Sequence, residues 1–411
     1  MGPEGPTHFA VAPSNKSYAQ QGQLIVGFAA NGKPDQKFGS HGRVSVVPGP
    51  GKVIEVSGVA VDSQNRVLVA GTYEPFPGFK NPIAKGTGEN LLFGNEPATE
   101  AFVIRFLPSG APDPTFGNGG VVISSLDAPV PNNEPFGQKP ATAEYERPVV
   151  TVSGIKVDSQ DRPVLAAQYT YAERTCFYKQ QYKHAIVARL TAAGALDTTF
   201  GNGGFIVIEG ERTLGLASGP GGEWAALGER ERACKSDIPP YWSTLAMFSE
   251  AGAPAALDPG RPRLIATGAL AVDGQGRILL AESPEESGGQ PKITRLLPNG
   301  DVDTGFGHGG GIVLSRFAPG TPVALAVDGK ERVVVGLGYG KRLELTRLTP
   351  AGKLEGKFGN RGLALAPKNG ANLEGLGIDS KGRLVAAGSI ESNATLKTGQ
   401  GIGIARFLPG G

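Results

Sequence analysis

The nine residues LDTTFGNGG at 196–204 occur in closely related form three more times, as PDPTFGNGG at 112–120, VDTGFGHGG at 302–310 and PDQKFGSHG at 34–42. Each copy joins an aromatic ring to glycines, which adopt the left-handed conformations of tight turns without steric cost. Internal repetition of this kind is the sequence signature of repeat folds. The motif therefore predicts an array of similar structural units.

The residues around each motif repeat as well, as four short apolar runs separated by turns. In the unit at 55–124 the first two runs read VSGVAVD and RVLVAG, and the last two read AFVIRF and VVIS. Alternating apolar and β-branched residues between Gly, Asp and Asn predict strands, and no helical period is present. Four strands in each repeated unit are typical of the blades of a β-propeller.

Counting the paired first and second strands predicts the number of blades. Because such pairs occur six times, we expect one closed all-β propeller of six four-stranded blades, with long loops on one face. Seven blades are the alternative, because QLIVGF at 23–28 and FAVAP at 9–13 also read as a third and a weak second strand.

The chain is expected to contain two segments. Residues 1–22 are predicted to be an N-terminal extension, with an extra edge strand as an option, and residues 23–411 to be the propeller. We expect the strand at 42–47 to pair with the strand at 403–407, so that the two chain ends complete one blade and close the ring.

Aspartate and arginine recur at fixed positions. An Asp ends the first strand and an Arg follows four residues later in five units, as Asp62 and Arg66, Asp158 and Arg162, Asp273 and Arg277, Asp328 and Arg332, and Asp379 and Arg383. The unit at 213–228 departs from the pattern, with Ser218 and Trp224 at these positions and no motif Phe near Asp258. A binding site is seldom copied into every blade. We therefore interpret these pairs as structural clasps and the motif Phe as a wedge between blades.

The third strands carry an arginine of their own, at Arg105, Arg189, Arg295, Arg347 and Arg406. We give them the same structural interpretation. Together the repeated sequence motifs resemble the delta-sixty repeat of bacterial, mostly secreted or surface proteins, and the wider NHL-like propeller group. VARLTAAG at 187–194, LDTTFGNGG and VDGQGRILLAE at 272–282 carry this resemblance, which extends over most of 23–411. It implies an exported propeller and no particular catalytic residue.

Composition excludes several classes of partner. The net charge is +2, from 40 basic and 38 acidic residues, and no basic stripe predicts nucleic-acid binding. No apolar run reaches the roughly 18 residues of a membrane span. The sequence begins without the basic and apolar regions of a signal peptide. We expect a monomer that is located outside the cell or on its surface.

The long unrepeated sequences nearly all connect a second to a third strand, or a fourth strand to the next unit. They therefore gather on one face, and loops held by a rigid scaffold often carry function. Tyrosine and tryptophan offer a stacking face with a polar tip, which suits protein or carbohydrate ligands. We expect a ligand-binding surface formed by Tyr73, Glu74, Tyr169, Tyr171, Arg174, Tyr241 and Trp242. The other interpretation is that these residues only pack the loops onto the blades.

Catalysis is the alternative function. Only four histidines are present, none at a metal-ligand spacing, and no nucleophile, phosphate-binding or dinucleotide motif occurs in a suitable context. We therefore expect no metal, no cofactor and no identifiable catalytic residue. A hydrolase or lactonase would instead use carboxylates around a cation at the channel mouth, drawn from Glu74, Glu229, Glu282, Glu374 and Glu391.

Lys156 and the two cysteines are further departures from the repeat. Lys156 stands where the other units have small residues, so it either holds an anion near the axis or, the favoured interpretation, pairs with a neighbouring carboxylate. Cys176 and Cys234 both follow second strands of adjacent units, so we expect them to form a disulfide. Because disulfides persist in oxidising compartments, this bond would favour an exported protein.

Overall fold

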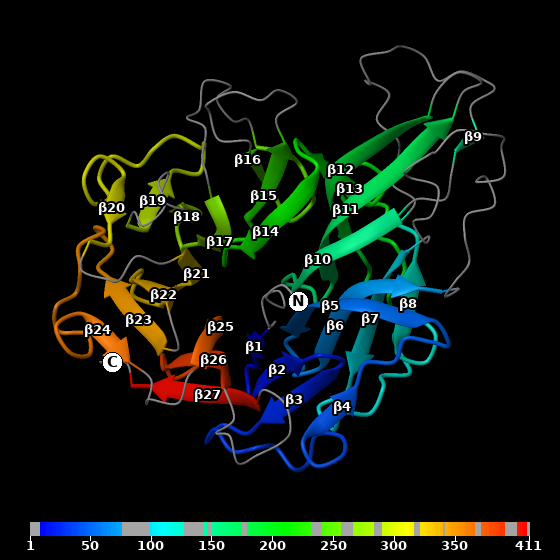
Figure 1. Cartoon of the computed structure of the whole chain (residues 1–411), viewed down its shortest axis with the longest axis horizontal. Helices are drawn as coiled ribbons and strands as arrows, with labels where there is room; N and C mark the ends of the chain where they lie inside the picture. The colour runs from blue at the N-terminus through cyan, green and yellow to red at the C-terminus, as the bar shows by residue number, and fades with distance from the viewer. Residues whose placement is uncertain are drawn as a thin grey trace.

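The computed structural model describes residues 9–75, 99–126, 144–145, 149–174, 179–231, 241–255, 266–282, 290–315, 321–339, 342–365, 371–390 and 401–408. Every regular element in these ranges is a β-strand, and the strands form seven antiparallel sheets. The described residues contain no helix that is long and apolar enough to span a membrane. Figure 1 shows the sheets arranged in chain order around a central axis, as the blades of a seven-bladed β-propeller.

Blades 1 to 3 lie in the N-terminal half. Their strands are β1 (Phe9–Val11), β2 (Ser17–Gln21), β3 (Leu24–Phe28) and β4 (Arg43–Ser45); β5 (Lys52–Val61), β6 (Val67–Glu74), β7 (Glu100–Phe106) and β8 (Val121–Ser124); and β10 (Val149–Val157), β11 (Pro163–Arg174), β12 (Lys179–Arg189) and β13 (Phe205–Ile208). A short strand, β9 (Glu144–Tyr145), also pairs with β11.

Blades 4 to 7 complete the ring. Their strands are β14 (Arg212–Ser218), β15 (Trp224–Glu231) and β16 (Tyr241–Phe248); β17 (Ala266–Val272), β18 (Ile278–Glu282), β19 (Lys292–Leu296) and β20 (Gly311–Val313); β21 (Thr321–Val327), β22 (Val333–Tyr339), β23 (Arg342–Leu348) and β24 (Leu363–Leu365); and β25 (Ala371–Ile378), β26 (Leu384–Ile390) and β27 (Gly401–Phe407). Blades 4 and 7 have three strands each within the described residues.

The first strands surround the axis. Each contacts the first strand of the next blade, in the order β1, β5, β10, β14, β17, β21 and β25, and β25 contacts β1 again. Figure 1 shows β1 between β25 and β5 near the centre. The first and last blades also share hydrogen bonds, because the Ser380 amide donates to Oδ1 of Asn15 at 2.9 Å.

The predicted count of six blades and the predicted strand pairing at the chain ends are wrong. The strand at 43–45 pairs with β3 of its own blade, through Ile25 and Val44, and not with β27. Residues 9–21 are therefore not an extension, because they supply the first and second strands of blade 1.

The count of paired first and second strands did not include blade 1, because its first turn lacks the residues that mark the other units. Ala12 and Lys16 occupy the positions of Asp62 and Arg66, and the Ala12 amide still donates to the Lys16 carbonyl at 2.8 Å. The turn keeps its shape through Asn15, whose φ of 64° matches that of the turn residues in other blades. Asparagine tolerates this conformation better than most residues, so the hairpin forms without its usual clasp.

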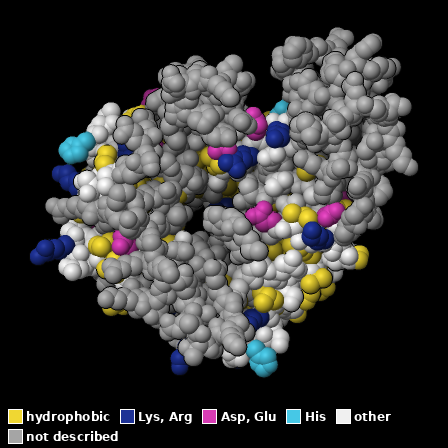
Figure 2. Space-filling view, in the orientation of Figure 1, with side chains coloured by type: hydrophobic (Ala, Val, Ile, Leu, Met, Phe, Trp, Pro, Cys, Tyr) yellow, Lys and Arg dark blue, Asp and Glu magenta, His cyan; other side chains and the backbone are white. Residues whose placement is uncertain are grey.

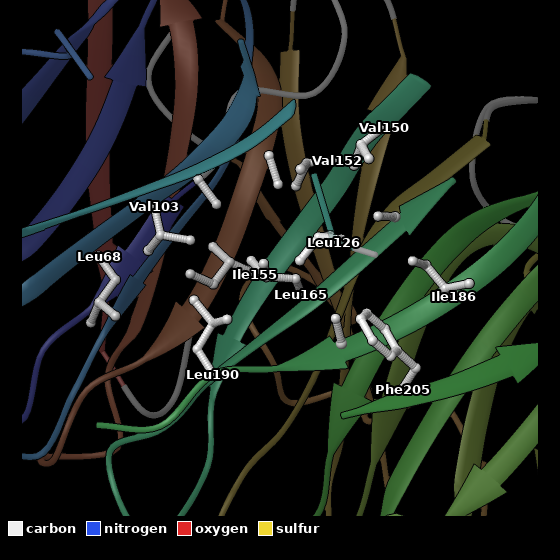
Figure 3. Packing of buried hydrophobic residues seen from close by; sticks show 14 of the residues in the cluster. Leu68, Val103, Leu126, Val150, Val152, Ile155, Leu165, Ile186, Leu190 and Phe205 are labelled. Carbon is white, nitrogen blue, oxygen red and sulfur yellow. The ribbon is translucent and has the colours of Figure 1, made fainter. Parts of the chain in front are cut away.

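The motif phenylalanines are buried where neighbouring blades meet. Phe38, Phe116, Phe200, Phe306 and Phe358 are at most 1 % exposed. Phe116 of blade 2 belongs to a cluster that also holds Leu68 and Val103 of its own blade and Leu165 and Ile186 of blade 3. Figure 3 shows other members of this cluster, with Leu68 and Val103 on one side and Ile186 and Phe205 on the other. Burial between blades is what the wedge interpretation predicts.

The arginines form the predicted structural clasps. In five blades the first-turn Arg places Nε 2.5–2.7 Å from Oδ2 of its Asp. On the third strand, Arg105 donates from Nε to Asp113 at 2.8 Å and from Nη1 to the Ala192 carbonyl of the next blade at 2.6 Å. These cations are therefore used inside the fold.

Blade 4 departs from the pattern one residue away from the predicted positions. Ser218 pairs with Trp224 in the ladder as Val61 pairs with Val67, so Gly219 and Glu223 are the residues that replace the Asp and Arg. Trp224 is only 2 % exposed and stacks nearly parallel to Phe248, with ring centroids 6.1 Å apart. Its bulk fills the core of the blade instead of replacing an arginine.

Candidate functional site

The hairpin of blade 3 is the strongest departure from the repeated blade. β11 and β12 have 12 and 11 residues, whereas the second strands of the other blades have 5 to 8. Their pairing continues as far as Arg174 and Lys179, and β9 adds to the end of β11 through Tyr145 and Glu173. Figure 1 shows the ends of these strands projecting beyond the ring, towards β9.

Four of the expected ligand residues lie on strand ends of blades 3 and 4. The backbone of Tyr171 is opposite Tyr182 in the extended hairpin, and Arg174 ends β11. Tyr241 and Trp242 begin β16 of the adjacent blade, opposite Glu231 and Arg230. We call these strand ends the blade 3–4 rim and define them as residues 170–174, 179–183, 229–231 and 241–243. The register thus places positions 70 residues apart in sequence at the same side of two neighbouring blades.

The other three expected ligand residues are buried. Tyr73 is 2 % exposed, and its hydroxyl accepts a hydrogen bond from the Gly51 amide at 2.5 Å. Glu74 and Tyr169 are each 7 % exposed, and Tyr169 belongs to the apolar cluster between blades 2 and 3. Tyr73 therefore holds the connection between blades 1 and 2 against blade 2. This contact agrees with the interpretation that the loop aromatics pack the loops onto the blades.

The reason lies in the place of the second strand within the sheet. β6 is paired on both edges, with β5 and β7, and both of its faces pack against neighbouring blades, so all eight residues are buried. An aromatic residue at the end of such a strand is inside the core even though the sequence beyond it is a loop.

The carboxylates proposed for a hydrolase are used in local contacts where their side chains are described. Glu229 pairs with Arg212, and Glu282 pairs with Lys292 at 3.2 Å and accepts a hydrogen bond from Thr294. Glu374 lies at an irregularity of the β25 ladder, between Leu373 and Gly375, and Glu391 lies outside the described residues. Within the described part of the chain, no group of three His, Cys, Asp or Glu residues is arranged to hold a metal ion.

Lys156 lies on β10, in the ring of first strands, opposite Val164. The ladder places Ala or Gly at this position in the other blades: Ala10, Ala60, Ala217, Ala271, Ala326 and Gly377. Solvent reaches the Lys156 side chain, but the surrounding protein desolvates the ammonium and lowers its pKa below the usual range of lysine. The expected carboxylate partner is not found among the ion pairs of the described residues.

Charges on the visible surface are dispersed. Figure 2 shows Lys and Arg side chains scattered among acidic and apolar ones, without a continuous basic stripe over the described part of this face. Cys176 and Cys234 lie outside the described residues, so the predicted disulfide stays a prediction.

Comparison with known proteins identifies no family for this sequence. No family model matches the sequence, and no curated protein matches it. A chain of the mitotic checkpoint complex is 9 % identical, with a TM-score of 0.48, over 93 % of this chain and 83 % of that chain. A catalytically inactive virginiamycin B lyase from Staphylococcus aureus is 11 % identical, with a TM-score of 0.45, over 94 % of each chain. A gluconolactonase from Xanthomonas campestris is 12 % identical, with a TM-score of 0.34, over 80 % of this chain and 83 % of that chain.

Proposed function

We propose that the protein is a binding or scaffolding propeller that recognises a protein or a glycan at the blade 3–4 rim. The observation that supports this proposal is the length of β11 and β12, which continue past the ends of the other second and third strands. The other blades form without such an extension, so ring assembly does not require it. Ordering the extra residues costs conformational entropy, which a binding role would justify.

The chemistry of the rim fits such a role. Tyr171, Arg174, Tyr241 and Trp242 are of the residue types that dominate binding energy at protein interfaces. The repeated turns at the opposite ends of the blades differ in this respect, because their arginines are paired with carboxylates inside the fold. The resemblance of the repeat to delta-sixty proteins supports the proposal that the protein is located outside the cell. We also propose that it is a monomer.

Tryptophan fluorescence provides a direct test, because the chain has only two tryptophans. Trp224→Phe removes the buried indole and leaves Trp242 as the single reporter at the rim. We expect neutral or N-acetylated hexasaccharides, or a protein partner, to shift the emission of this variant in a saturable way. Tyr171→Ala should weaken that binding about tenfold, the scale of one interface anchor.

The matched control is His308→Ala, an exposed motif residue on the opposite turns of blade 5. This variant should bind as the parent does. A ligand whose affinity depends on His308 and is insensitive to Tyr171 would overturn the proposal, because its footprint would lie on the turns that all blades share.

A further inference from the structure

The outer edge of blade 7 lacks the fourth strand that five of the other blades have in the described residues. In blades 1, 2, 3, 5 and 6 a fourth strand of three or four residues covers the third strand. Among the described residues no strand pairs with the outer edge of β27. The strand that was expected there, β4, pairs with β3 of blade 1 instead. An open edge presents backbone N–H and C=O groups that can pair with another chain.

The side chains of β27 are correspondingly less covered than their equivalents. On β7 the residues Ala101, Val103, Arg105 and Phe106 are at most 4 % exposed. The ladder places Ile402, Ile404, Arg406 and Phe407 at the same positions of β27, and all four are only half-buried. The difference marks a surface of the size and place that a fourth strand covers elsewhere.

Arg406 shows what chemistry this surface lacks. In blades 2, 3, 5 and 6 the third-strand Arg donates from Nε to a carboxylate at 2.6–2.9 Å and lies 4.4–4.5 Å above the motif Phe ring. In blade 7 the Nε and Nη1 atoms of Arg406 are buried and have no hydrogen-bond partner. Only Nη2 is bonded, to the Asn15 carbonyl at 3.1 Å and to the Ser17 hydroxyl at 3.4 Å. Buried donors without partners destabilise a structure, most of all when they carry charge.

The neighbouring blade offers a matching acceptor. In the complete blades the glycine after the motif Phe donates its amide to a turn carbonyl of the next blade, as Gly117 does to Ala193 at 2.8 Å and Gly307 to Ala351 at 2.9 Å. The equivalent acceptor next to blade 7 is the carbonyl of Asn31, which precedes Gly32 as Ala193 precedes Gly194. No backbone amide of the described residues donates to it.

We propose that β27 accepts an extended peptide of a partner protein that carries an acidic residue, two spacers, then Phe-Gly, followed by a short apolar strand. The carboxylate would pair with Nε of Arg406, and the ring would stack on the guanidinium. The glycine amide would bond to Asn31, and the apolar segment would add to β27 as an antiparallel fourth strand. This site is separate from the blade 3–4 rim and does not depend on the function proposed there.

A folded second copy of the chain is not the occupant. Each of its five motif phenylalanines is at most 1 % exposed, so the motifs are already used within their own blades. The ligand must therefore present its motif in an extended, unfolded segment. Blade 4 serves as an internal comparison, because Met247 takes the place of the third-strand Arg there and offers no cation to an acidic peptide.

The test uses a labelled synthetic peptide with the sequence of residues 110–124, GAPDPTFGNGGVVIS, added to the full chain. We expect saturable binding by fluorescence anisotropy, with slower amide hydrogen exchange in residues 401–408. Asp113→Asn or Phe116→Ala in the peptide should each weaken binding about tenfold or more, because each removes one recognition element. Arg406→Met in the protein should do the same.

Lys381→Met is the matched control, because it removes an exposed cation from the same blade without touching β27. It should leave the affinity for the peptide unchanged. If Arg406→Met does not fold, Arg406→Lys keeps the charge but loses the planar fork, and it should still weaken binding. The proposal is overturned if the peptide fails to bind, if Lys381→Met weakens binding as much as the Arg406 variants, or if exchange slows in another blade instead.

Discussion

Nε of Arg189 donates to Oδ2 of Asp197 at 2.9 Å, and the same guanidinium lies 4.5 Å above the ring of Phe200. Nη1 of Arg189 bonds to the carbonyl of Glu250 in the next blade. One arginine thus connects the motif carboxylate, the motif ring and the neighbouring blade. The recurrence of the motif is explained by this unit, which blades 2, 3, 5 and 6 each use at the junction with the next blade.

Phe200→Ala should destabilise the protein by about 3–5 kcal/mol, because it leaves a cavity at a side chain that is 1 % exposed. Urea denaturation of the two proteins measures the difference in the free energy of unfolding. Val207→Ala, at a 43 % exposed position of the same blade, is the control and should change it by less than about 1 kcal/mol. An equally small effect of Phe200→Ala would show that the ring is not a wedge.

Arg105→Met and Arg406→Met should differ in their effect on stability. The first removes the cation that is hydrogen-bonded to the buried carboxylate of Asp113 and leaves it only Arg66, at 3.7 Å. Breaking a buried ion pair typically costs about 3–5 kcal/mol. The second removes a guanidinium that has no carboxylate bound to Nε, so its cost should be near zero or negative. Thermal melting of both variants decides this. Equal destabilisation would mean that Arg406 has a partner of its own in solution.

Stability should fall in acid as the motif carboxylates are protonated. Burial alone would raise the pKa of Asp197, but hydrogen bonds from Thr199 and Arg189 outweigh it and lower this pKa. The pKa of Asp113 is lowered against its burial in the same way, by Thr115 and Arg105. A lowered folded-state pKa contributes stability that is present above the unfolded value of about 3.9 and is lost as the pH falls through the folded value.

We therefore expect the urea midpoint to be flat from pH 7 to about pH 5 and to drop below about pH 4, where the unfolded chain binds more protons. Asp197→Asn should be less stable at pH 7 and should lose less stability between pH 4 and pH 2.5. A variant whose acid limb matches that of the parent would show that Asp197 does not contribute to this dependence.

The disulfide predicted between Cys176 and Cys234 is tested by counting free thiols in the denatured, non-reduced protein. We expect none, and reduction should destabilise the chain by roughly 4 kcal/mol if the bond constrains the unfolded state as chain-entropy models describe. Two reactive thiols per chain would refute the bond and remove one argument for export.

Local sequence patterns predict much of the fold. The sequence of one repeat unit predicts its strands, its Asp–Arg clasp and the burial of its motif Phe. The clasp of Asp62 and Arg66 and the buried Phe200 are examples. Seven blades were only the alternative prediction because Ala12 and Lys16 replace the marker residues of the first turn of blade 1, although Asn15 keeps the turn in shape. The register of blade 4 was misplaced by one residue for a similar reason, the loss of both markers at Gly219 and Glu223.

The candidate sites depended more on tertiary structure. By itself the sequence determined that this is an all-β repeat protein and which of its charges are structural, because those interactions span fewer than ten residues. Only the tertiary structure decided that Tyr73 is buried, that β11 extends past the ring and that Arg406 lacks a carboxylate. The ring is joined where an added Cβ on Gly375 would lie 2.4 Å from Cβ of Phe9. Which edges stay open is set by contacts such as this one, between residues at opposite ends of the chain, and no local pattern encodes them.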